Sequence, residues 1–167
     1  MTAHNRNEVG RNAGQAPRLS AITATTAELI ATATLTIETG GEGFFEFTRE
    51  AARFVADAGG KDGALFLFLR HTSASLVIQE NADPDVQRDL VTALDRLAPT
   101  DVGWVHDTEG PDDMPAHVKA MLAGVSLHVP VSNGVLALGT WQGLYLAEHR
   151  ARSHRREVVL QFIGSRR

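Results

Sequence analysis

The chain has 167 residues, with 16 basic and 20 acidic side chains, a formal net charge of −4, seven histidines and no cysteine. That length is typical of one domain, which buries about 70% of the surface that its unfolded chain exposes. The missing cysteine excludes disulfides, thiolate nucleophiles and cysteine-ligated metals, the negative charge argues against a nucleic-acid partner, and the lack of an apolar run of about 20 residues argues against a membrane partner.

The first 28 residues are predicted to be a flexible extension, and residues 29–167 a single domain. The segment Met1–Ser20 is rich in Gly, Asn, Ala and Arg and has no apolar stretch like the core of a signal peptide. We therefore expect a cytoplasmic protein.

The first half of the domain is predicted to contain four strands and one helix. Residues 30–38 alternate with a period of two, which is typical of a half-buried strand. Residues 44–47 form the next strand, and Thr48 is placed to cap a helix that runs to Ala58. Residues 64–69 are continuously apolar, which predicts a strand covered on both faces. The return strand is expected at residues 75–79.

Two helices are predicted next along the chain. Asp83 and Pro84 are typical of a helix start, and a stripe of buried apolar residues continues from there to Leu97. A third helix starts at Asp113 and is ended by Gly124. The face of this helix that we expect to be buried consists of Val118, Met121 and Leu122.

The chain is predicted to finish with four strands, at residues 125–131, 134–138, 141–148 and 157–163. Helices and strands are therefore segregated along the sequence rather than alternating. That order predicts an α+β fold with a mainly antiparallel sheet or sandwich.

Three polar segments are candidates for chemistry, and the first follows the continuous apolar strand. His71, Thr72, Ser73 and Ser75 place one imidazole and three hydroxyls where that strand emerges. Such groups can hold an anion or a metal ion, although hydroxyls at a strand end also satisfy the backbone of a turn.

The second segment, residues 106–117, holds two histidines and four carboxylates. Neutral imidazole nitrogens and carboxylate oxygens are ligands for zinc, manganese or magnesium, and neighbouring acids can orient the rings. The spacing matches no strict metal motif, so a surface loop with helix-capping acids remains the alternative.

The third segment, residues 139–143, surrounds a tryptophan with two glycines, a hydroxyl and an amide. Exposed backbone amides there can cradle phosphate and the indole can stack on a ring, while a bulge beside a core tryptophan would have the same composition. Glu148 ends the next strand and is placed to face the same cleft.

Together these segments resemble the YjbQ family, also called the secondary thiamine-phosphate synthase family. The matching stretches are His71–Leu76 with Asn81, His106–His117, and Leu138–Gly143 with Glu148. The resemblance covers roughly residues 35–164. It implies an α+β protein with a seven-stranded, mainly antiparallel β-sandwich and about three helices, assembled as a homotrimer with its site near subunit boundaries.

The resemblance also implies weak thiamine-phosphate synthase activity, which joins a pyrimidine pyrophosphate to a thiazole phosphate. The chain would then bind small phosphorylated metabolites and a divalent metal ion, zinc or magnesium. The expected metal ligands are His71, His106 and His117. The expected catalytic residues are His71, Asp107, Asp113 and Glu148. The expected substrate-binding residues are Thr72, Ser73, Asn81, Gly139, Thr140, Trp141 and Gln142.

Two alternative functions use the same residues. In a metal-dependent hydrolase, a bound ion lowers the pKa of water, and Asp113 or Glu148 is the general base. In a non-catalytic trimer that binds a phosphorylated metabolite, the anion-binding groups are kept and the metal is dispensable.

Overall fold

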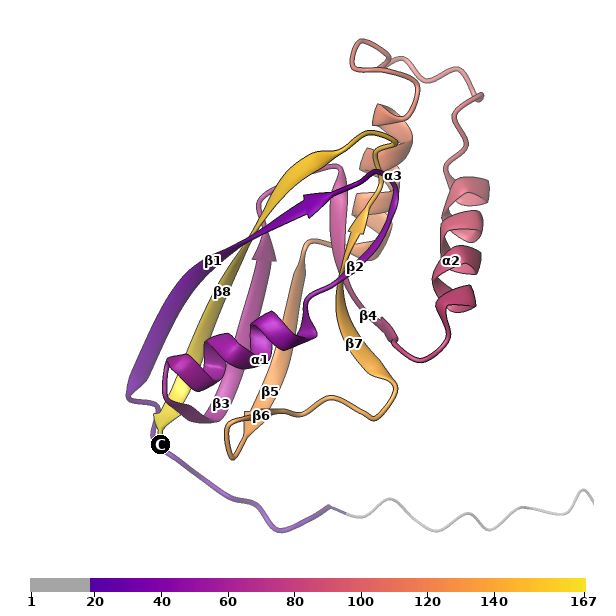
Figure 1. The fold of residues 1–167 in the computed structure, drawn as a ribbon. Coiled ribbons are helices and arrows are strands. Elements are labelled where there is room, and N and C mark those ends of the chain that lie inside the picture. The colour runs from indigo at the N-terminus through magenta and orange to yellow at the C-terminus, as the bar shows by residue number, and fades with distance from the viewer. Residues whose placement is uncertain (1–18) are drawn as a thin grey trace, which may run out of the picture.

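The computed structural model describes residues 19–167 and arranges eight strands and three helices around two antiparallel sheets (Figure 1). Residues 19–28 contain no helix or strand, and the rest of the predicted extension, residues 1–18, lies outside the described residues. The strands are β1 (Leu29–Thr39), β2 (Gly43–Glu46), β3 (Gly60–Leu69), β4 (Ala74–Glu80), β5 (Ser126–Ser132), β6 (Val135–Leu136), β7 (Gln142–Glu148) and β8 (His154–Arg166). The helices are α1 (Thr48–Asp57), α2 (Pro84–Leu97) and α3 (Asp113–Ala123).

The α+β fold class is confirmed, with eight strands where the family resemblance implies seven. Eight is the number that the apolar pattern indicates, and the shortest strand, β6, has two residues. The larger sheet has the strand order β1-β8-β3-β5-β6, and the smaller one has the order β2-β7-β4. Every pairing among these strands is antiparallel.

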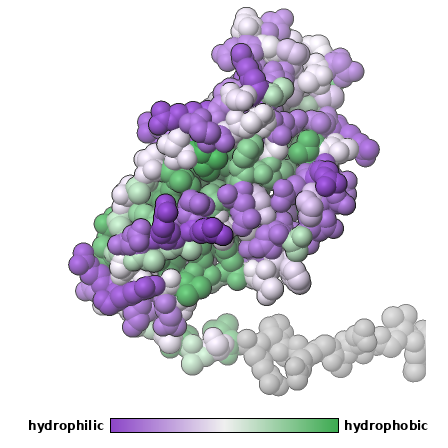
Figure 2. All heavy atoms as spheres, viewed as in Figure 1, coloured by the Kyte–Doolittle hydropathy of each residue, from purple (hydrophilic) through white to green (hydrophobic). Residues whose placement is uncertain are grey.

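The hydrophobic core lies between one face of the larger sheet and a layer formed by α1 and the smaller sheet. Its fully buried members come from α1 and from strands of both sheets, among them Val55, Leu67, Leu76, Leu146 and Phe162. Burial of such side chains contributes roughly 1.5–3 kcal/mol each. Around α1, hydrophobic side chains reach the surface in patches (Figure 2). Within residues 19–167, no helix is long and apolar enough to cross a membrane.

Glycines allow β3 and β8 to approach each other closely where their register shifts. A Cβ atom on Gly63 would lie 2.2 Å from the carbonyl oxygen of Ile163, and one on Gly164 would lie 2.2 Å from that of Asp62. Both distances are far inside van der Waals contact, so a side chain at either position would push β3 and β8 apart.

The helix starts differ in how they are capped. Asp83 caps α2 as predicted, because its carboxylate accepts the amide of Asp85 at 2.9 Å. The prediction that Thr48 caps α1 is wrong, since Phe47 holds the cap position without a side-chain hydrogen bond. The Thr48 hydroxyl instead accepts the amide of Leu144 at 2.9 Å and so ties the start of α1 to β7.

The apolar run in β3 is covered on one face only, contrary to the prediction. Leu65, Leu67 and Leu69 point into the core and are at most 1% exposed. Phe66 and Phe68 point to the opposite face and are 36% and 51% exposed, because side chains alternate along a strand and no other described element covers that face.

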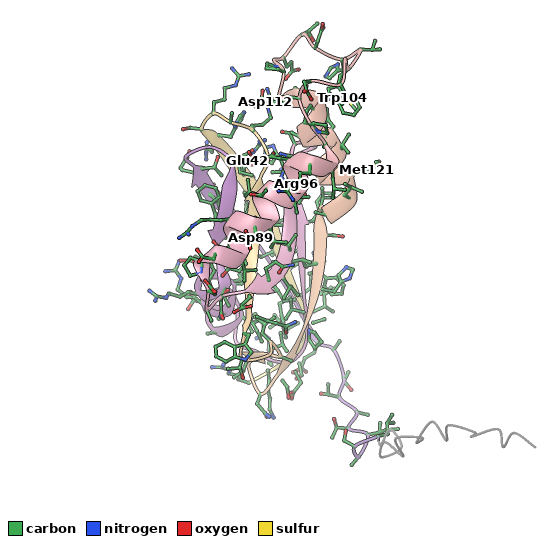
Figure 3. The ribbon with its side chains drawn as sticks, turned by 90° about the vertical axis from the view of Figure 1, so that its right-hand side faces the viewer. Glu42, Asp89, Arg96, Trp104, Asp112 and Met121 are labelled. Carbon is green, nitrogen blue, oxygen red and sulfur yellow. The ribbon has the colours of Figure 1, made fainter. Side chains whose placement is uncertain are left out.

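The predicted buried stripes of α2 and α3 also differ from the structure. None of the α2 residues is fully buried, and Leu97 is 66% exposed. In α3, Met121 and Leu122 are 77% and 56% exposed, and Met121 lies on the outer side of the helix (Figure 3). The buried face of α3 instead carries small and charged residues, including Ala116 and Ala120, which lets the helix pack closely against β4.

Lys119 is the long side chain on this buried face of α3. It is 3% exposed, and its ammonium donates to Glu42 at 2.5 Å and to Asp95 at 2.6 Å. Burial by itself lowers the pKa of the Lys119 ammonium, but the two carboxylates raise it above its ordinary value. Lys119 therefore clamps α3 to α2 and to the turn before β2.

Candidate functional site

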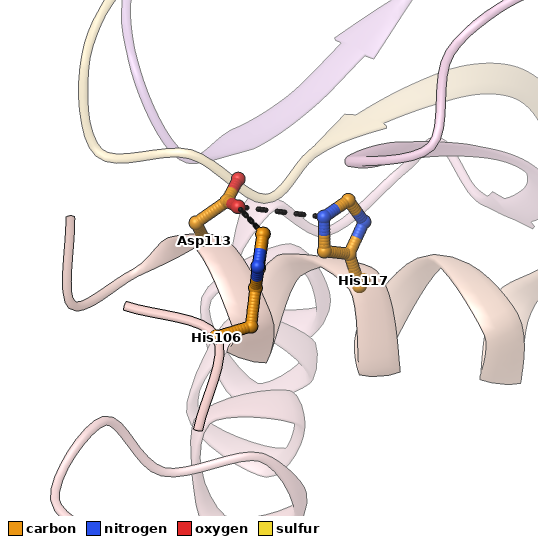
Figure 4. Close-up of side chains that lie close together, drawn as sticks. All are labelled: His106, Asp113 and His117. Atoms are coloured by element: carbon orange, nitrogen blue, oxygen red, sulfur yellow. Dashed lines mark hydrogen bonds and ion pairs between the residues drawn. The ribbon is translucent and has the colours of Figure 1, made fainter. Parts of the chain in front are cut away.

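Three metal-ligating side chains converge where the long loop after α2 meets the start of α3 (Figure 4). Asp113 is the first residue of α3, and His117 lies one helical turn later on the same face. His106 reaches the same point from the loop. Its Nε2 atom lies 2.8 Å from Asp113 Oδ2, and the Nε2 atom of His117 lies 3.4 Å from that oxygen. All three ligand atoms lie within 4.8 Å of one another.

The position of the Asp113 carboxylate is fixed from behind. Asp113 is 2% exposed, and its Oδ1 atom accepts a hydrogen bond from Arg150, a buried residue of the connection between β7 and β8. Arg150 also donates to Asp112 Oδ2 at 3.1 Å and to the carbonyl oxygen of Glu109 at 2.8 Å. Asp113 is therefore held in place by the protein without any ion.

Asp112 supports the same loop from the other side of Arg150. Its carboxylate accepts the amide of Ala151 at 2.9 Å as well as the Arg150 guanidinium. Burial raises the pKa of the Asp112 carboxyl, but these hydrogen bonds outweigh burial and lower the pKa below its ordinary value. Asp112 and Trp104, whose indole donates to the carbonyl of Pro99 at 2.9 Å, lie at the same end of the molecule (Figure 3).

The ring of His117 is oriented so that one nitrogen is free to act as a ligand. Its Nδ1 atom lies 2.9 Å from the carbonyl oxygen of Thr72. Because a carbonyl oxygen only accepts, Nδ1 carries a proton, and in the neutral ring the lone pair is then on Nε2, the nitrogen nearest Asp113. Metal-ligating histidines are held in this way by a backbone carbonyl on the second nitrogen.

His71 lies outside this three-residue cluster, although the sequence predicts it as a metal ligand. It follows β3, and its Nε2 atom accepts the amide of Glu157 at 3.1 Å. Burial, and then the nearby charge of Arg156, lower the pKa of the His71 imidazole. The neutral ring therefore carries its proton on Nδ1, and neither nitrogen has a free lone pair. Asp113 occupies the place in the cluster that the sequence predicts for His71.

Glu148 is buried in an ion pair, which removes it from the candidates for a general base. It is 1% exposed, and its two oxygens accept from Arg156 at 2.7 and 2.6 Å. Thr39 and the amide of Arg150 donate to the same carboxylate at 2.9 and 3.0 Å. Burial raises the pKa of Glu148, but the hydrogen bonds from Arg156 and Arg150 outweigh burial and lower it.

Of the other predicted residues of the first two segments, one is part of the Glu148 network and two are exposed. Ser73 is nearly buried, and its hydroxyl accepts from Arg156 at 3.1 Å, so it belongs to the Glu148 network. Asp107 is exposed, and its side chain is not among the clustered ligand atoms. The Thr72 side chain is exposed beside His117.

The third segment lies at the opposite end of the smaller sheet from the histidines. Gln142 pairs with Glu80, while Glu148, six residues further along β7, pairs with Ala74. At about 3.3 Å per residue this is a separation of about 20 Å. Trp141 is 64% exposed there, and its carbonyl accepts the amide of Asn81 at 3.1 Å. Within one chain, the predicted phosphate-binding residues Gly139, Thr140, Trp141, Gln142 and Asn81 therefore do not join the histidine cluster.

Sequence reasoning did not assign the role of Arg150 or of the Thr72 carbonyl. Arg150 stands two residues after Glu148 in a stretch rich in arginine, and the acidic segment at residues 101–117 is the complementary signal that was available. A backbone carbonyl leaves no such signal, because any residue provides one.

Comparisons with known proteins place these residues in a family context. A family model described as "UPF0047 protein YjbQ-like" matches residues 33–165. The chain is 49% identical over 131 residues to UPF0047 protein sll1880 of Synechocystis sp., which spans 78% of this chain and 89% of that protein. It is 41% identical over 132 residues to UPF0047 protein YjbQ of Escherichia coli O157:H7, over 78% of this chain and 96% of that one.

Solved structures show the same fold. A YjbQ/UPF0047 family protein from Clostridium acetobutylicum, described as uncharacterised, superposes with a TM-score of 0.72 at 37% identity, over 78% of this chain and 98% of that one. The hypothetical protein APE1520 of Aeropyrum pernix K1 superposes with a TM-score of 0.75 at 27% identity, over 81% and 99%.

Proposed function

This chain belongs to the YjbQ-like family of UPF0047 proteins, and we propose that it binds a divalent metal ion through His106, Asp113 and His117 and a small phosphorylated metabolite beside that ion. The observation that carries the proposal is the convergence of three ligand atoms within 4.8 Å. As the reaction to test first we propose a transfer of the thiamine-phosphate synthase type.

The donor set fits a zinc-like ion. Two ligands that each lie about 2.0–2.1 Å from a tetrahedral ion are roughly 3.3 Å apart, and the distance between Asp113 Oδ2 and His117 Nε2 is 3.4 Å. The shorter distance to His106 is that of a hydrogen bond, which an ion would replace. Two nitrogens and one oxygen suit zinc better than magnesium, which prefers oxygen ligands.

Other residues of the chain hold two of the three proposed ligands, Asp113 and His117, in position. Arg150 fixes one oxygen of Asp113 and leaves the other toward the histidines, and the Thr72 carbonyl sets the proton on the far side of the His117 ring. A divalent ion bound there would supply positive charge for phosphate oxygens as a leaving group departs. The exposed Thr72 side chain and Arg70, whose side chain is 61% exposed, line the same pocket as His117, and we propose that they contact the same phosphate.

A metal-dependent hydrolase is the second candidate, and it lacks a base among the residues first considered. Glu148 is fully enclosed by Arg156, Thr39 and a backbone amide. Both oxygens of Asp113 are engaged, one with Arg150 and one with the histidines. Hydrolysis would therefore need a base from outside this set, which is why transfer or simple binding ranks above it.

The metal site is tested by the ion content of His117→Ala. We expect the purified full chain to bind one zinc ion, and the variant to bind zinc at least about tenfold more weakly, because the ligand with its lone pair toward Asp113 is lost. Equilibrium dialysis against zinc measures both. His128→Ala is the matched control, since His128 is exposed and contacts Phe66 edge to face, away from the cluster. Wild-type zinc affinity in His117→Ala would mean that the ion is held elsewhere.

The reaction is tested on the same preparations. Thiamine phosphate formation from the two precursors, and hydrolysis of generic phosphoesters, are measured in parallel with and without zinc. Formation of thiamine phosphate that depends on His117 supports transfer. Phosphoester cleavage that depends on His117 supports the hydrolase. If zinc binds tightly but neither product forms, the result supports a metabolite-binding protein.

We also propose that the protein is a homotrimer. The third polar segment lies about 20 Å along β7 from Glu148, at the opposite end of the smaller sheet from the histidine cluster, and we propose that a neighbouring chain places its own copy of the segment beside that cluster. Phe66, 36% exposed on the outer face of β3 and outside the pocket beside the histidine cluster, is an apolar side chain of the kind that association covers.

The trimer is tested by its mass in solution. Light scattering should give about three times the chain mass of 18.0 kDa. Phe66→Glu should lower that mass, because a charge would be placed on the exposed face of β3. Leu97→Glu, at an exposed site at the end of α2, should leave the mass unchanged. A wild-type mass of one chain would overturn this part of the proposal.

A further inference from the structure

We infer that a pocket between the end of β3 and α3 binds the apolar organic group of a phosphate monoester, and that His71 donates a hydrogen bond to its phosphate. The inference rests on the proposed function, because it takes from it the metal cluster and the phosphorylated ligand. Beyond the proposed function, it specifies that the ligand carries an apolar organic group, and it assigns His71 to hydrogen bonding with the phosphate instead of metal binding.

The pocket has a volume of about 560 Å³ and shares His117 with the metal cluster. That volume lies in the range of small-molecule sites, roughly 300–1,000 Å³. Its walls are mainly apolar and come from the end of β3 and from the outer side of α3. The apolar wall residues used in this argument are Phe68, Leu69, Met121 and Val125.

The polar residues of the pocket gather at its His117 end. Arg70, His71 and Thr72 lie there in sequence, next to the histidine that faces Asp113. None of the residues that line this pocket within residues 19–167 is acidic. A ligand with an anionic head and an apolar body therefore matches the pocket in charge and in polarity from one end to the other.

The protonation of His71 makes it a donor at this polar end. Its Nε2 atom accepts the Glu157 amide, so the neutral ring carries its proton on Nδ1. Among the described residues, that Nδ1 atom has no hydrogen-bond partner, and no fully buried side-chain nitrogen or oxygen is without one. Nδ1 is therefore reached by solvent and is available to a ligand oxygen, whereas a metal ion would need the lone pair that the amide occupies.

Residues 19–167 leave the apolar wall on α3 uncovered. Met121 is 77% exposed although the helix buries charged Lys119 on its other side. The occupant to which we commit is the organic group of the ligand, because the wall is continuous through His117 with the site that would hold the phosphate.

The experiment compares phenyl phosphate with inorganic phosphate by calorimetry on the zinc-loaded full chain. We expect phenyl phosphate to bind about tenfold more tightly, since the ring adds buried apolar area to the same anion. Met121→Glu should abolish that preference, because it places a negative charge in the wall. Leu122→Glu is the matched control on the same helix, exposed and outside the pocket, and should keep it.

His71 is tested with the same two probes. His71→Ala should weaken both by a similar factor and leave zinc content unchanged, and His71→Gln, which keeps an N–H donor, should recover part of the loss. A loss of bound zinc in His71→Ala would overturn the proposal that His71 acts as a hydrogen-bond donor to the phosphate. Equal affinity of the wild type for the two probes, or an unchanged preference in Met121→Glu, would overturn the pocket while leaving the zinc site standing. A preference for phenyl phosphate in a chain that binds no zinc would overturn the metal proposal and support the pocket.

Discussion

Replacing Arg156 by methionine should lower the free energy of unfolding by about 3–5 kcal/mol, because it leaves a buried carboxylate without its partner. Arg156 and Glu148 have side chains that are 5% and 0% exposed, joined at 2.6 Å. Among residues 19–167, the Thr39 hydroxyl and one backbone amide would remain as donors to Glu148. For a chain of this length the melting temperature should fall by roughly 6–20 °C.

A neighbouring ion pair provides the control for that experiment. Arg155 and Glu38 lie 3.7 Å apart with side chains that are 65% and 73% exposed. Such exposed pairs contribute about 0–1 kcal/mol, so Arg155→Met should leave the melting temperature nearly unchanged. Equal losses in the two variants would show that the burial of the Glu148 pair has no energetic consequence.

Lowering the pH from 7 to 4 should remove roughly 3 kcal/mol of stability through His149 alone. His149 is 3% exposed and its Nε2 atom lies 2.7 Å from the Ser75 hydroxyl. Burial, and then the positive charge of Lys119, lower the pKa of His149 from 6.5 to about 4. The other charged groups that face it are Glu148, which raises the pKa, and Arg156, which lowers it.

The sign follows from proton binding in the two states. Between pH 6.5 and about 4 the unfolded chain binds a proton at His149 and the folded chain does not, so acid favours unfolding. The contribution is complete above pH 6.5 and is lost as the pH falls toward 4. The lowered pKa of His71 also makes acid favour unfolding. The pKa of the Glu148 carboxyl is lowered from 4.5, so the stability that this group contributes is lost only as the pH falls below 4.5.

Urea unfolding at pH 7, 6, 5 and 4, at one fixed protein concentration, measures this effect. His149→Gln should reduce the slope of stability against pH in that range, because the titrating group is gone. The exposed His128 provides the matched variant, His128→Gln, which should follow the wild type. Parallel curves for His149→Gln and the wild type would contradict the assignment to His149.

Local patterns predicted the elements well, because each depends on a few neighbouring residues. Short stretches of sequence are enough to predict the alternation in β1, the Asp83 cap of α2 and the end of α3 at Gly124. Burial was harder to predict. The apolar residues Met121 and Leu122 do not mark the buried face of α3, because close packing against β4 favours the alanines on the other side.

The candidate site was predicted in its residue types and only partly in its geometry. His106, Asp113 and His117 lie within one segment of twelve residues, so their proximity followed from the sequence. The position of His71 depends on a backbone amide of β8 that is 86 residues away in the sequence. The position of Glu148, at the end of β7, depends on Arg156 of β8. Contacts of this kind depend on strand register, which the sequence pattern alone does not specify.

The exposed outer side of α3 has a consequence for how the protein can change over time. Met121 forms a wall of the pocket but gives almost no buried area to the core, so substitutions there carry little risk of unfolding. Most binding pockets share their walls with the core and must trade stability against new specificity. Here a substitution at Met121 would change the wall of the proposed ligand pocket while Asp113, Lys119 and Arg150 keep the scaffold in place.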